Sequence, residues 1–332
     1  MTGENAPFDF AAAKKVFSRI GFALIAFIAV SYAVVFALEL LALYFLPEKA
    51  LDGTLSTIIS AIAMYGVGVP VFYLLIKKLE PQKGETGNAK FSTVAVLFCI
   101  AMCFMYAGSF VGDAVYTFVS EKFGIYIYEA TLELISSIPW YVALITTVIL
   151  APIFEELVFR KLIISRTAVY GEKLAILFSA IMFAFFHMSI QQFFYAFLIG
   201  LALGYLYVRT SKLIYPIILH ACVNLFGSVF PLLLMEYAGY EELISAETPE
   251  AMLEIAAANP VGYAVIMIYS IAVLALAFGG FALFFVYKKK LHFNPSPLQL
   301  PRDSEATVAF AGVGVILFIL LTVILPVVLS VI

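Results

Sequence analysis

Long apolar runs, separated by short polar loops, dominate this chain. Nine of these runs approach or exceed the length of about 20 residues that a helix needs to cross a bilayer. They cover residues 20–46, 54–76, 91–112, 138–164, 174–188, 191–208, 213–235, 261–287 and 306–331. The fifth and sixth runs are short, so we expect a tilted helix there, or one that enters the bilayer only part way. The pattern predicts an all-α, polytopic protein of the cell membrane with about nine transmembrane helices.

The overall composition excludes an ordinary soluble domain. The chain is 64% hydrophobic and only 12% charged, with a mean hydropathy of +1.06. All three cysteines, Cys99, Cys103 and Cys222, lie inside apolar runs, where they are expected as small buried hydrophobic side chains. Their spacing indicates neither a disulfide framework nor a CxxC metal site.

The distribution of positive charge predicts how the chain crosses the membrane. With nine spans and a cytoplasmic N-terminus, all but two of the 19 Lys and Arg residues fall in cytoplasmic segments, the exceptions being Lys49 and Lys122. The loop 236–260 then faces outward, and it carries six glutamates with no Lys or Arg. We divide the chain into N-terminal helices (1–137), a catalytic helical core (138–235), and an acidic outer loop with C-terminal helices (236–332).

Two adjacent glutamates, Glu155 and Glu156, lie inside the fourth predicted span. Carboxylates at membrane depth are costly, so they are candidates for a functional site. Glu156 precedes Arg160 by four residues, the favourable spacing for a helical ion pair, whereas Glu155 has no such partner and suits general acid–base chemistry. Pro152, one turn earlier, should free a backbone carbonyl and kink the helix. The alternative is that both glutamates are solvated charges at the cytoplasmic rim.

Two of the three histidines also fall in apolar runs. His187 ends the run from Phe183, and His220 stands four residues before Asn224, which places these two polar side chains on one helical face. An imidazole and an amide on one face could bind an oxygen that becomes negatively charged. Each motif alone is equally compatible with ordinary hydrogen bonds between helices.

The ordered set Glu155-Glu156-x-x-x-Arg160, Phe183-x-x-x-His187 and His220-x-x-x-Asn224 resembles the family of CAAX prenyl proteases and bacteriocin-processing or self-immunity proteins (Abi, CPBP). The resemblance covers about residues 138–230. It implies an intramembrane endopeptidase in which Glu155 and His187 activate water while His220 and Asn224 stabilise the oxyanion, with Glu156 and Arg160 in support. The implied partners are the lipid bilayer and a membrane-associated or lipidated protein or peptide substrate, with no nucleic acid.

The resemblance leaves the metal and the activity open. The family is often described as metalloproteases, and Glu155, His187 and His220 could supply three zinc ligands. The sequence has no HExxH motif, so a metal-free Glu/His pair is the preferred interpretation. Two other functions are compatible with the chain: a non-catalytic immunity or interaction protein of the membrane, and a proton-coupled transporter that uses the Glu and His residues as a relay.

Overall fold

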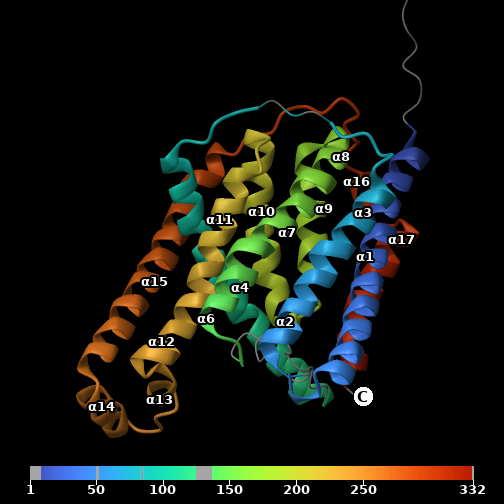
Figure 1. The fold of residues 1–332 in the computed structure, drawn as a ribbon. Helices are drawn as coiled ribbons and strands as arrows, with labels where there is room; N and C mark the ends of the chain where they lie inside the picture. The colour runs from blue at the N-terminus through green and yellow to red at the C-terminus, as the bar shows by residue number, and fades with distance from the viewer. Residues whose placement is uncertain (1–8, 50–51, 83, 85, 125–136, 331–332) are drawn as a thin grey trace, which may run out of the picture.

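Helices joined by loops make up the part of the chain that the computed structural model describes, namely residues 9–49, 52–82, 84, 86–124 and 137–330 (Figure 1). Seven helical segments in this part are long and apolar enough to cross a bilayer. They are α1 (Phe10–Phe45), α2 to α3 (Gly53–Ile76), α4 (Phe91–Phe123), Trp140–Tyr170, α10 (Ile190–Thr210), Ile214–Ala238 and Pro260–Lys290, which contains α15 (Pro260–Tyr287). These helices confirm the all-α class and a multi-pass membrane protein.

The other two predicted spans are present as shorter helices. Helix α9 (Glu172–Phe186) has 15 residues and α17 (Val313–Leu329) has 17, or about 22 and 26 Å of helix at 1.5 Å per residue. A break after α16 (Glu305–Phe310) divides the predicted ninth span, so α17 is shorter than that span. By contrast α10, predicted to be short, has 21 residues and is long enough to cross.

The third span extends beyond its predicted end at residue 112. Helix α4 continues to Phe123, where Gly124 ends it in a left-handed conformation (φ 66°). The predicted span 91–112 was therefore too short. Residues 125–136 lie outside the described part of the chain.

Four π-helical segments interrupt the spans around the middle of the molecule. They are η2 (Ile62–Gly68), η3 (Leu144–Leu150), η4 (Leu157–Ile164) and η6 (Leu225–Val229). Three of these segments end two residues before a proline: Pro70, Pro152 and Pro231. A π turn shifts the backbone acceptor from residue i−4 to i−5, and proline lacks the N–H that would continue either pattern.

The two spans that carry most of the polar motifs are therefore composite helices. The fourth consists of α6 (Trp140–Ala143), η3, α7 (Ala151–Glu156), η4 and α8 (Ser165–Thr167). The seventh consists of α11 (Ile214–Asn224), η6 and α12 (Phe230–Ala238). Pro152 is the second residue of α7, at the junction with η3, where the sequence predicts a local break of the helix.

Glycines allow the helices around the site to approach closely. A Cβ on Gly200 would lie 3.1 Å from the Cβ of Ala180, and one on Gly204 would lie 3.1 Å from Ile176, so α10 lies directly against α9. Two small residues four positions apart thus allow the close helix packing that is common in membrane proteins. At the other side of the molecule, α4 and α15 meet where Gly280 faces the carbonyl of Cys99.

The segments predicted to be cytoplasmic lie at one end of the molecule, at the top of Figure 1. The loop after α3 is joined to α8, since Gln82 N–H donates to the carbonyl of Ser165 at 2.6 Å. Gly87 N–H similarly donates to the carbonyl of Thr210. The segment after α15 returns to the turn that precedes α9, where Leu300 N–H donates to the carbonyl of Tyr170. Which side of the membrane this end faces stays a prediction.

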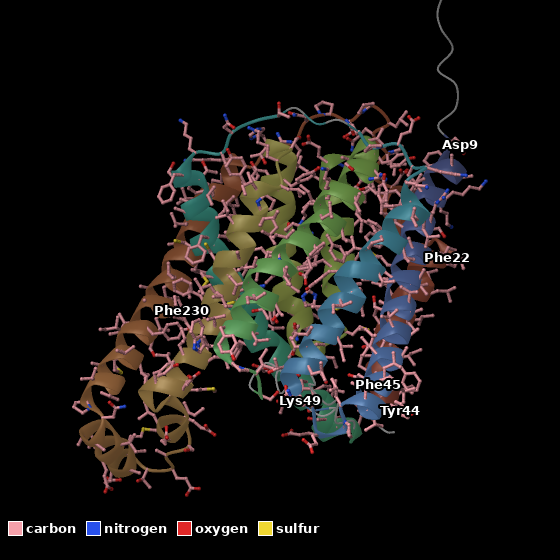
Figure 2. The ribbon with its side chains drawn as sticks, viewed as in Figure 1. Asp9, Phe22, Tyr44, Phe45, Lys49 and Phe230 are labelled. Carbon is pink, nitrogen blue, oxygen red and sulfur yellow. The ribbon has the colours of Figure 1, made fainter. Side chains whose placement is uncertain are left out.

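The outer surface of the helices is apolar, as lipid contact requires. Phe22, Tyr44 and Phe45 project from α1 with 47%, 79% and 69% of their surface exposed (Figure 2). At the opposite end from the polar loops, the short helices α13 (Tyr240–Ile244) and α14 (Pro249–Ala258) carry the acidic segment between α12 and α15. The predicted outer loop is thus folded into helices.

Candidate active site

A fully buried ion pair forms the base of the site. Arg160 Nε lies 2.9 Å from Glu156 Oε2, and both side chains have 0% exposure. Arg160 also donates to Ser179 Oγ at 3.0 Å, and Ser179 in turn donates to the carbonyl of Phe159 at 2.8 Å. A buried pair persists only when its remaining polar atoms are satisfied, and Ser179 does this from α9. The predicted Glu156–Arg160 pair is present, and Glu156 is not a solvated charge at the rim.

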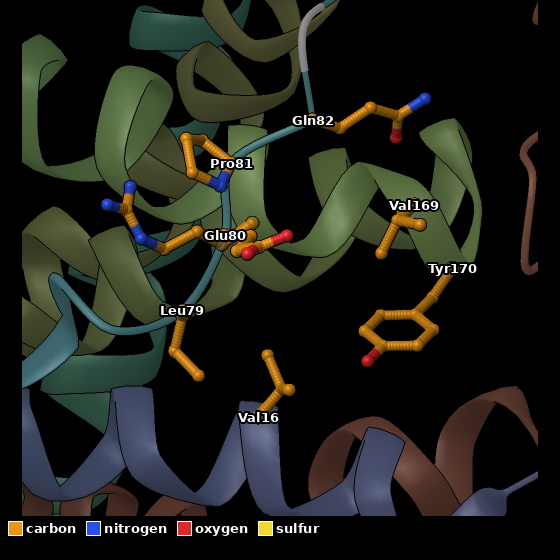
Figure 3. Close-up of a pocket in the computed structure, with 8 residues that line it drawn as sticks. Val16, Leu79, Glu80, Pro81, Gln82, Val169 and Tyr170 are labelled. Atoms are coloured by element: carbon orange, nitrogen blue, oxygen red, sulfur yellow. The ribbon is translucent and has the colours of Figure 1, made fainter.

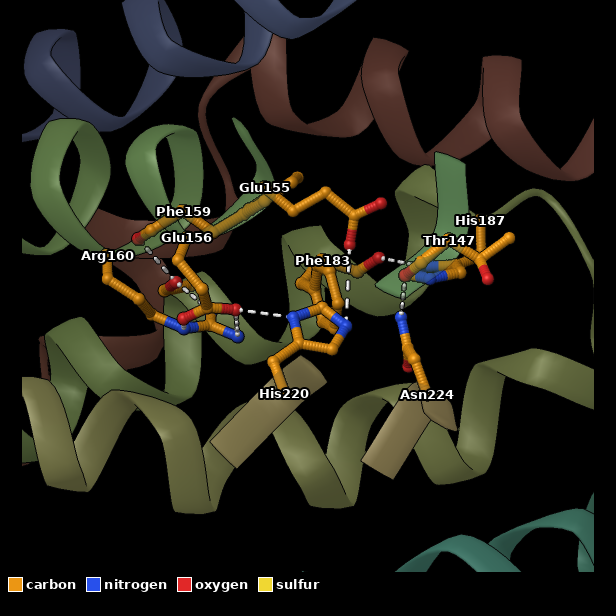
Figure 4. A network of polar contacts seen from close by, with 10 residues as sticks. Thr147, Glu155, Glu156, Phe159, Arg160, Phe183, His187, His220 and Asn224 are labelled. Carbon is orange, nitrogen blue, oxygen red and sulfur yellow. Dashed lines mark hydrogen bonds and ion pairs between the residues drawn. The ribbon is translucent and has the colours of Figure 1, made fainter. Parts of the chain in front are cut away.

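Glu156 holds a second partner that sequence spacing did not reveal. Its Oε1 lies 2.9 Å from Nδ1 of His220, which α11 brings across from a position 64 residues further along the chain (Figure 4). Since a carboxylate accepts, Nδ1 of His220 carries the hydrogen and Nε2 points away from Glu156. Glu156 therefore fixes the ring orientation of His220 in addition to neutralising Arg160.

Glu155 lies on the other side of the His220 ring. Its Oε2 is 3.8 Å from His220 Nε2, and the Glu155 side chain retains 16% exposure. The two adjacent glutamates thus contact opposite edges of one imidazole, which follows from the roughly 100° turn between neighbouring residues of a helix. Glu155 is the accessible carboxylate of the cluster, and Glu156 is the enclosed one.

His187 stands at the end of α9, where the chain turns into α10. Its Nδ1 lies 2.8 Å from the carbonyl of Phe183, so Nδ1 carries the hydrogen and Nε2 is left as an acceptor. The next residue, Met188, adopts a left-handed conformation (φ 51°), which a non-glycine residue takes at a cost of roughly 1–2 kcal/mol. Such strain is typical of functional sites.

The ring of Phe183 separates and orients the polar groups. It meets the His187 ring edge-on at 4.6 Å and the His220 ring edge-on at 5.9 Å, and the Arg160 guanidinium lies 4.9 Å from its centre. Phe183 is 2% exposed. The phenylalanine of the Phe183-x-x-x-His187 motif is therefore a shared wall between the imidazoles, and it supplies the carbonyl that fixes His187.

Asn224 reaches the same layer from α11, one turn after His220. Its Nδ2 donates to the carbonyl of Thr147 in η3 at 2.8 Å. Ser228 donates to the carbonyl of Asn224 at 2.6 Å and lies 3.1 Å from Thr147 Oγ1. Thr147, Ser179 and Ser228 contribute to this network and were not predicted from the sequence. The feature of the sequence that points to Thr147 is Pro152, which follows five residues later.

The side chains that could hold a zinc ion are Glu155, His187 and His220. Within the described residues, no group of three or more His, Cys, Asp and Glu side chains is placed to hold a metal ion. Glu156 and the Phe183 carbonyl engage the Nδ1 atoms of His220 and His187, so Nε2 of each histidine and the Glu155 carboxylate are the atoms that could bind a metal. We derive no step through a metal.

A cavity of about 320 Å³ lies elsewhere, beside the loop after α3 (Figure 3). Val16, Leu79, Glu80 and Tyr170 line it, together with Arg166. Arg166 is buried, and it donates to carbonyls near the ends of two helices, at Ile76 and Leu162. Its role is to cap those helix ends. The cavity contains none of the Glu/His cluster.

The fold and the cluster define a class: multi-pass membrane proteins with glutamate and histidine side chains gathered inside the helix bundle. The family model "Type II CAAX prenyl endopeptidase Rce1-like" matches residues 137–226, which include Glu155, His187, His220 and Asn224. This segment is therefore similar to the Rce1-like domain.

One curated relative extends the comparison. The chain is 30% identical over 107 residues to the Bacillus subtilis (strain 168) protein named "Putative membrane peptidase YdiL". The aligned part is 31% of this chain and 42% of that protein, so the chain covers less than half of its relative's length. No solved structure matches this chain.

Proposed function

We propose that this protein is a CAAX-type intramembrane endopeptidase that hydrolyses a peptide bond of a membrane-associated or lipidated protein or peptide. The observation that carries the proposal is that Glu155 and Glu156 contact opposite edges of His220, with Arg160 behind them. The Rce1-like match over the same residues supports the same reaction class.

The charges of this cluster favour one mobile proton. Two carboxylates and one guanidinium leave a net charge of −1, which is costly in a poorly solvated interior. A single proton held between Glu155 and His220 Nε2 makes the cluster neutral. When His220 holds this proton, Nε2–H becomes a donor and Glu155 becomes a base, which is the state that hydrolysis requires.

In the proposed mechanism, Glu155 and His187 Nε2 bind the attacking water. Glu155 takes a proton as the water oxygen adds to the scissile carbonyl. The developing oxyanion then accepts hydrogen bonds from His220 Nε2–H and from the Asn224 amide. Glu155 returns its proton to the leaving nitrogen as the C–N bond breaks, which yields a carboxylic acid and an amine. Glu156 and Arg160 hold His220 in place and do not exchange protons with substrate.

The test is cleavage of a panel of quenched fluorescent membrane peptides, including prenylated ones, by purified protein in detergent. We expect Glu155→Gln to abolish cleavage, since it removes the base. Glu39→Gln is the matched control, because Glu39 is also a carboxylate within a spanning helix but lies in α1, outside the cluster. Equal activity of Glu155→Gln and wild type would refute the assignment.

The same assay separates the metal-free and zinc interpretations. We expect a chelator to leave cleavage unchanged, since the proposed mechanism uses no metal. Loss of activity with chelator, restored by zinc, would replace the metal-free pair by a zinc site at Glu155, His187 and His220.

A further inference from the structure

The side-chain amide of Asn224 is held by a backbone carbonyl in the middle of another helix. Such carbonyls are normally taken by the helix's own N–H groups. Asn224 Nδ2 nevertheless lies 2.8 Å from the carbonyl oxygen of Thr147, inside η3. The Thr147 carbonyl must therefore lack its usual backbone donor within the helix.

Pro152 explains why this donor is missing. In η3 the backbone bonds follow the i−5 pattern, and the last of them runs from Ala151 N–H to the carbonyl of Thr146. The next bond in this register would run from residue 152 to Thr147, and proline has no N–H to make it. The carbonyl of Thr147 is thus left to a donor from outside the helix, and Asn224 is that donor.

The same arrangement recurs at a second position in the molecule. In η6 the last bond runs from Phe230 N–H to the carbonyl of Leu225, and Pro231 follows. The carbonyl left without its donor belongs to Phe226, and the Tyr269 hydroxyl of α15 donates to it at 2.7 Å. In both cases a side chain from another helix binds the carbonyl that the π turn and proline leave free.

The contact at Thr147 determines how the Asn224 amide is oriented. A carbonyl only accepts, so the nitrogen of the amide must face Thr147, and a flipped amide is excluded by chemistry. One of the two N–H bonds is used there. The second N–H remains for another acceptor, in the layer that holds His220 one turn earlier on the same helical face.

We propose that Pro152 is a positioning residue of this site: by leaving the Thr147 carbonyl without a backbone donor, it fixes the Asn224 amide so that its second N–H points at the oxyanion. The inference rests on the proposed function for the role of Asn224. The link between Pro152 and Asn224 itself rests only on the hydrogen bonds described above.

The decisive variant is Pro152→Ala, which restores an N–H. In the π register this N–H is donated to Thr147. If the helix relaxes to the α register, Ala151 N–H is donated to Thr147 instead, so the carbonyl gains a backbone donor in either case. We expect kcat for peptide cleavage to fall about tenfold, the value of one neutral hydrogen bond, with KM within twofold and the melting temperature not lowered. Pro152→Ser, which also supplies an N–H, should behave alike.

Two controls separate positioning from a general structural effect. Pro231→Ala makes the same change at η6, and we expect its kcat to stay within twofold of wild type. In an Asn224→Ala background, Pro152→Ala should lower kcat by less than twofold further, since the group it positions is gone. A full tenfold loss in that background would overturn the proposal.

A second measurement does not depend on catalysis. In protein labelled with ¹⁵N-asparagine, the side-chain amide signals of Asn224 are identified by their loss in Asn224→Ala. We expect Pro152→Ala to shift these signals and Pro231→Ala to leave them in place. Unshifted signals in Pro152→Ala would overturn the proposal even if no peptide is cleaved. If Glu155→Gln is inactive while Pro152→Ala retains wild-type kcat, the positioning role fails and the proposed function stands.

Discussion

The buried ion pair between Glu156 and Arg160 gives the sharpest prediction on stability. Replacement of Arg160 by Met keeps an unbranched apolar stem but removes the guanidinium group and its charge. Glu156, with 0% exposure, then loses its Nε contact at 2.9 Å and the weaker Nη2 contact at 3.5 Å. It retains the hydrogen bond from His220 Nδ1 at 2.9 Å.

The expected cost follows from what remains around Glu156. Removal of one partner of a buried pair typically costs about 3–5 kcal/mol, because the other charge is left uncompensated. We expect the low end of this range, about 3 kcal/mol, since His220 still donates to Glu156. In the double variant Glu156→Gln/Arg160→Met no buried charge is orphaned, so the loss should be smaller, about 1–2 kcal/mol.

The measurement is the free energy of unfolding in mixed detergent micelles for wild type, both single variants and the double variant. The interaction free energy from this cycle should be at least about 1 kcal/mol. Ser179→Ala is a useful companion variant, since it removes one hydrogen bond of Arg160 without creating a lone charge. If the double variant is no more stable than Arg160→Met, the loss of stability does not come from an uncompensated charge on Glu156, and our reasoning is wrong.

Further predictions concern the packing of the helices. Gly280→Ala should destabilise the protein by about 1–3 kcal/mol, because the added Cβ would lie 1.9 Å from the Cys99 carbonyl oxygen. In Gly279→Ala the added Cβ meets no atom within 4 Å, so this variant should be neutral or stabilising by up to about 1 kcal/mol. Thermal melts of both variants measure the difference. A destabilised Gly279→Ala would contradict this account of the α4–α15 contact. Tyr269→Phe should cost about 1 kcal/mol by leaving the Phe226 carbonyl without its donor, and an unchanged melting temperature would show that this carbonyl finds another partner.

Much of the fold could be predicted from hydropathy alone, because only helices that satisfy their own backbone groups cross a bilayer. Each predicted span corresponds to a helical segment. Errors occur where length was judged from apolarity: α4 continues to Phe123 through a mixed stretch, and α16 and α17 divide a run that looked continuous. The π segments were not predicted, since the same residues are compatible with an α-helix and only the following prolines hint at them.

Within the site, sequence reasoning succeeded where partners lie on one helix and failed where they come from different helices. The Glu156–Arg160 pair follows from i,i+4 spacing, and so does the common face of His220 and Asn224. The contact between Glu156 and His220 spans 64 residues, so no local pattern predicts it.

The contact between helices is also what distinguishes the two glutamates in the proposed mechanism. Spacing alone assigned Glu155 to chemistry because it lacks an i+4 partner, and assigned Glu156 to support because it has one. In the structure, Glu156 is enclosed by Arg160 and His220, while Glu155 keeps its outward edge accessible. Glu156 has 0% exposure and is enclosed by its two partners, so an attacking water does not reach it, whereas Glu155 retains 16% exposure and lies 3.8 Å from His220 Nε2. We therefore expect Glu155→Gln to lower kcat with little loss of stability, and Glu156→Gln to lower both kcat and the free energy of unfolding.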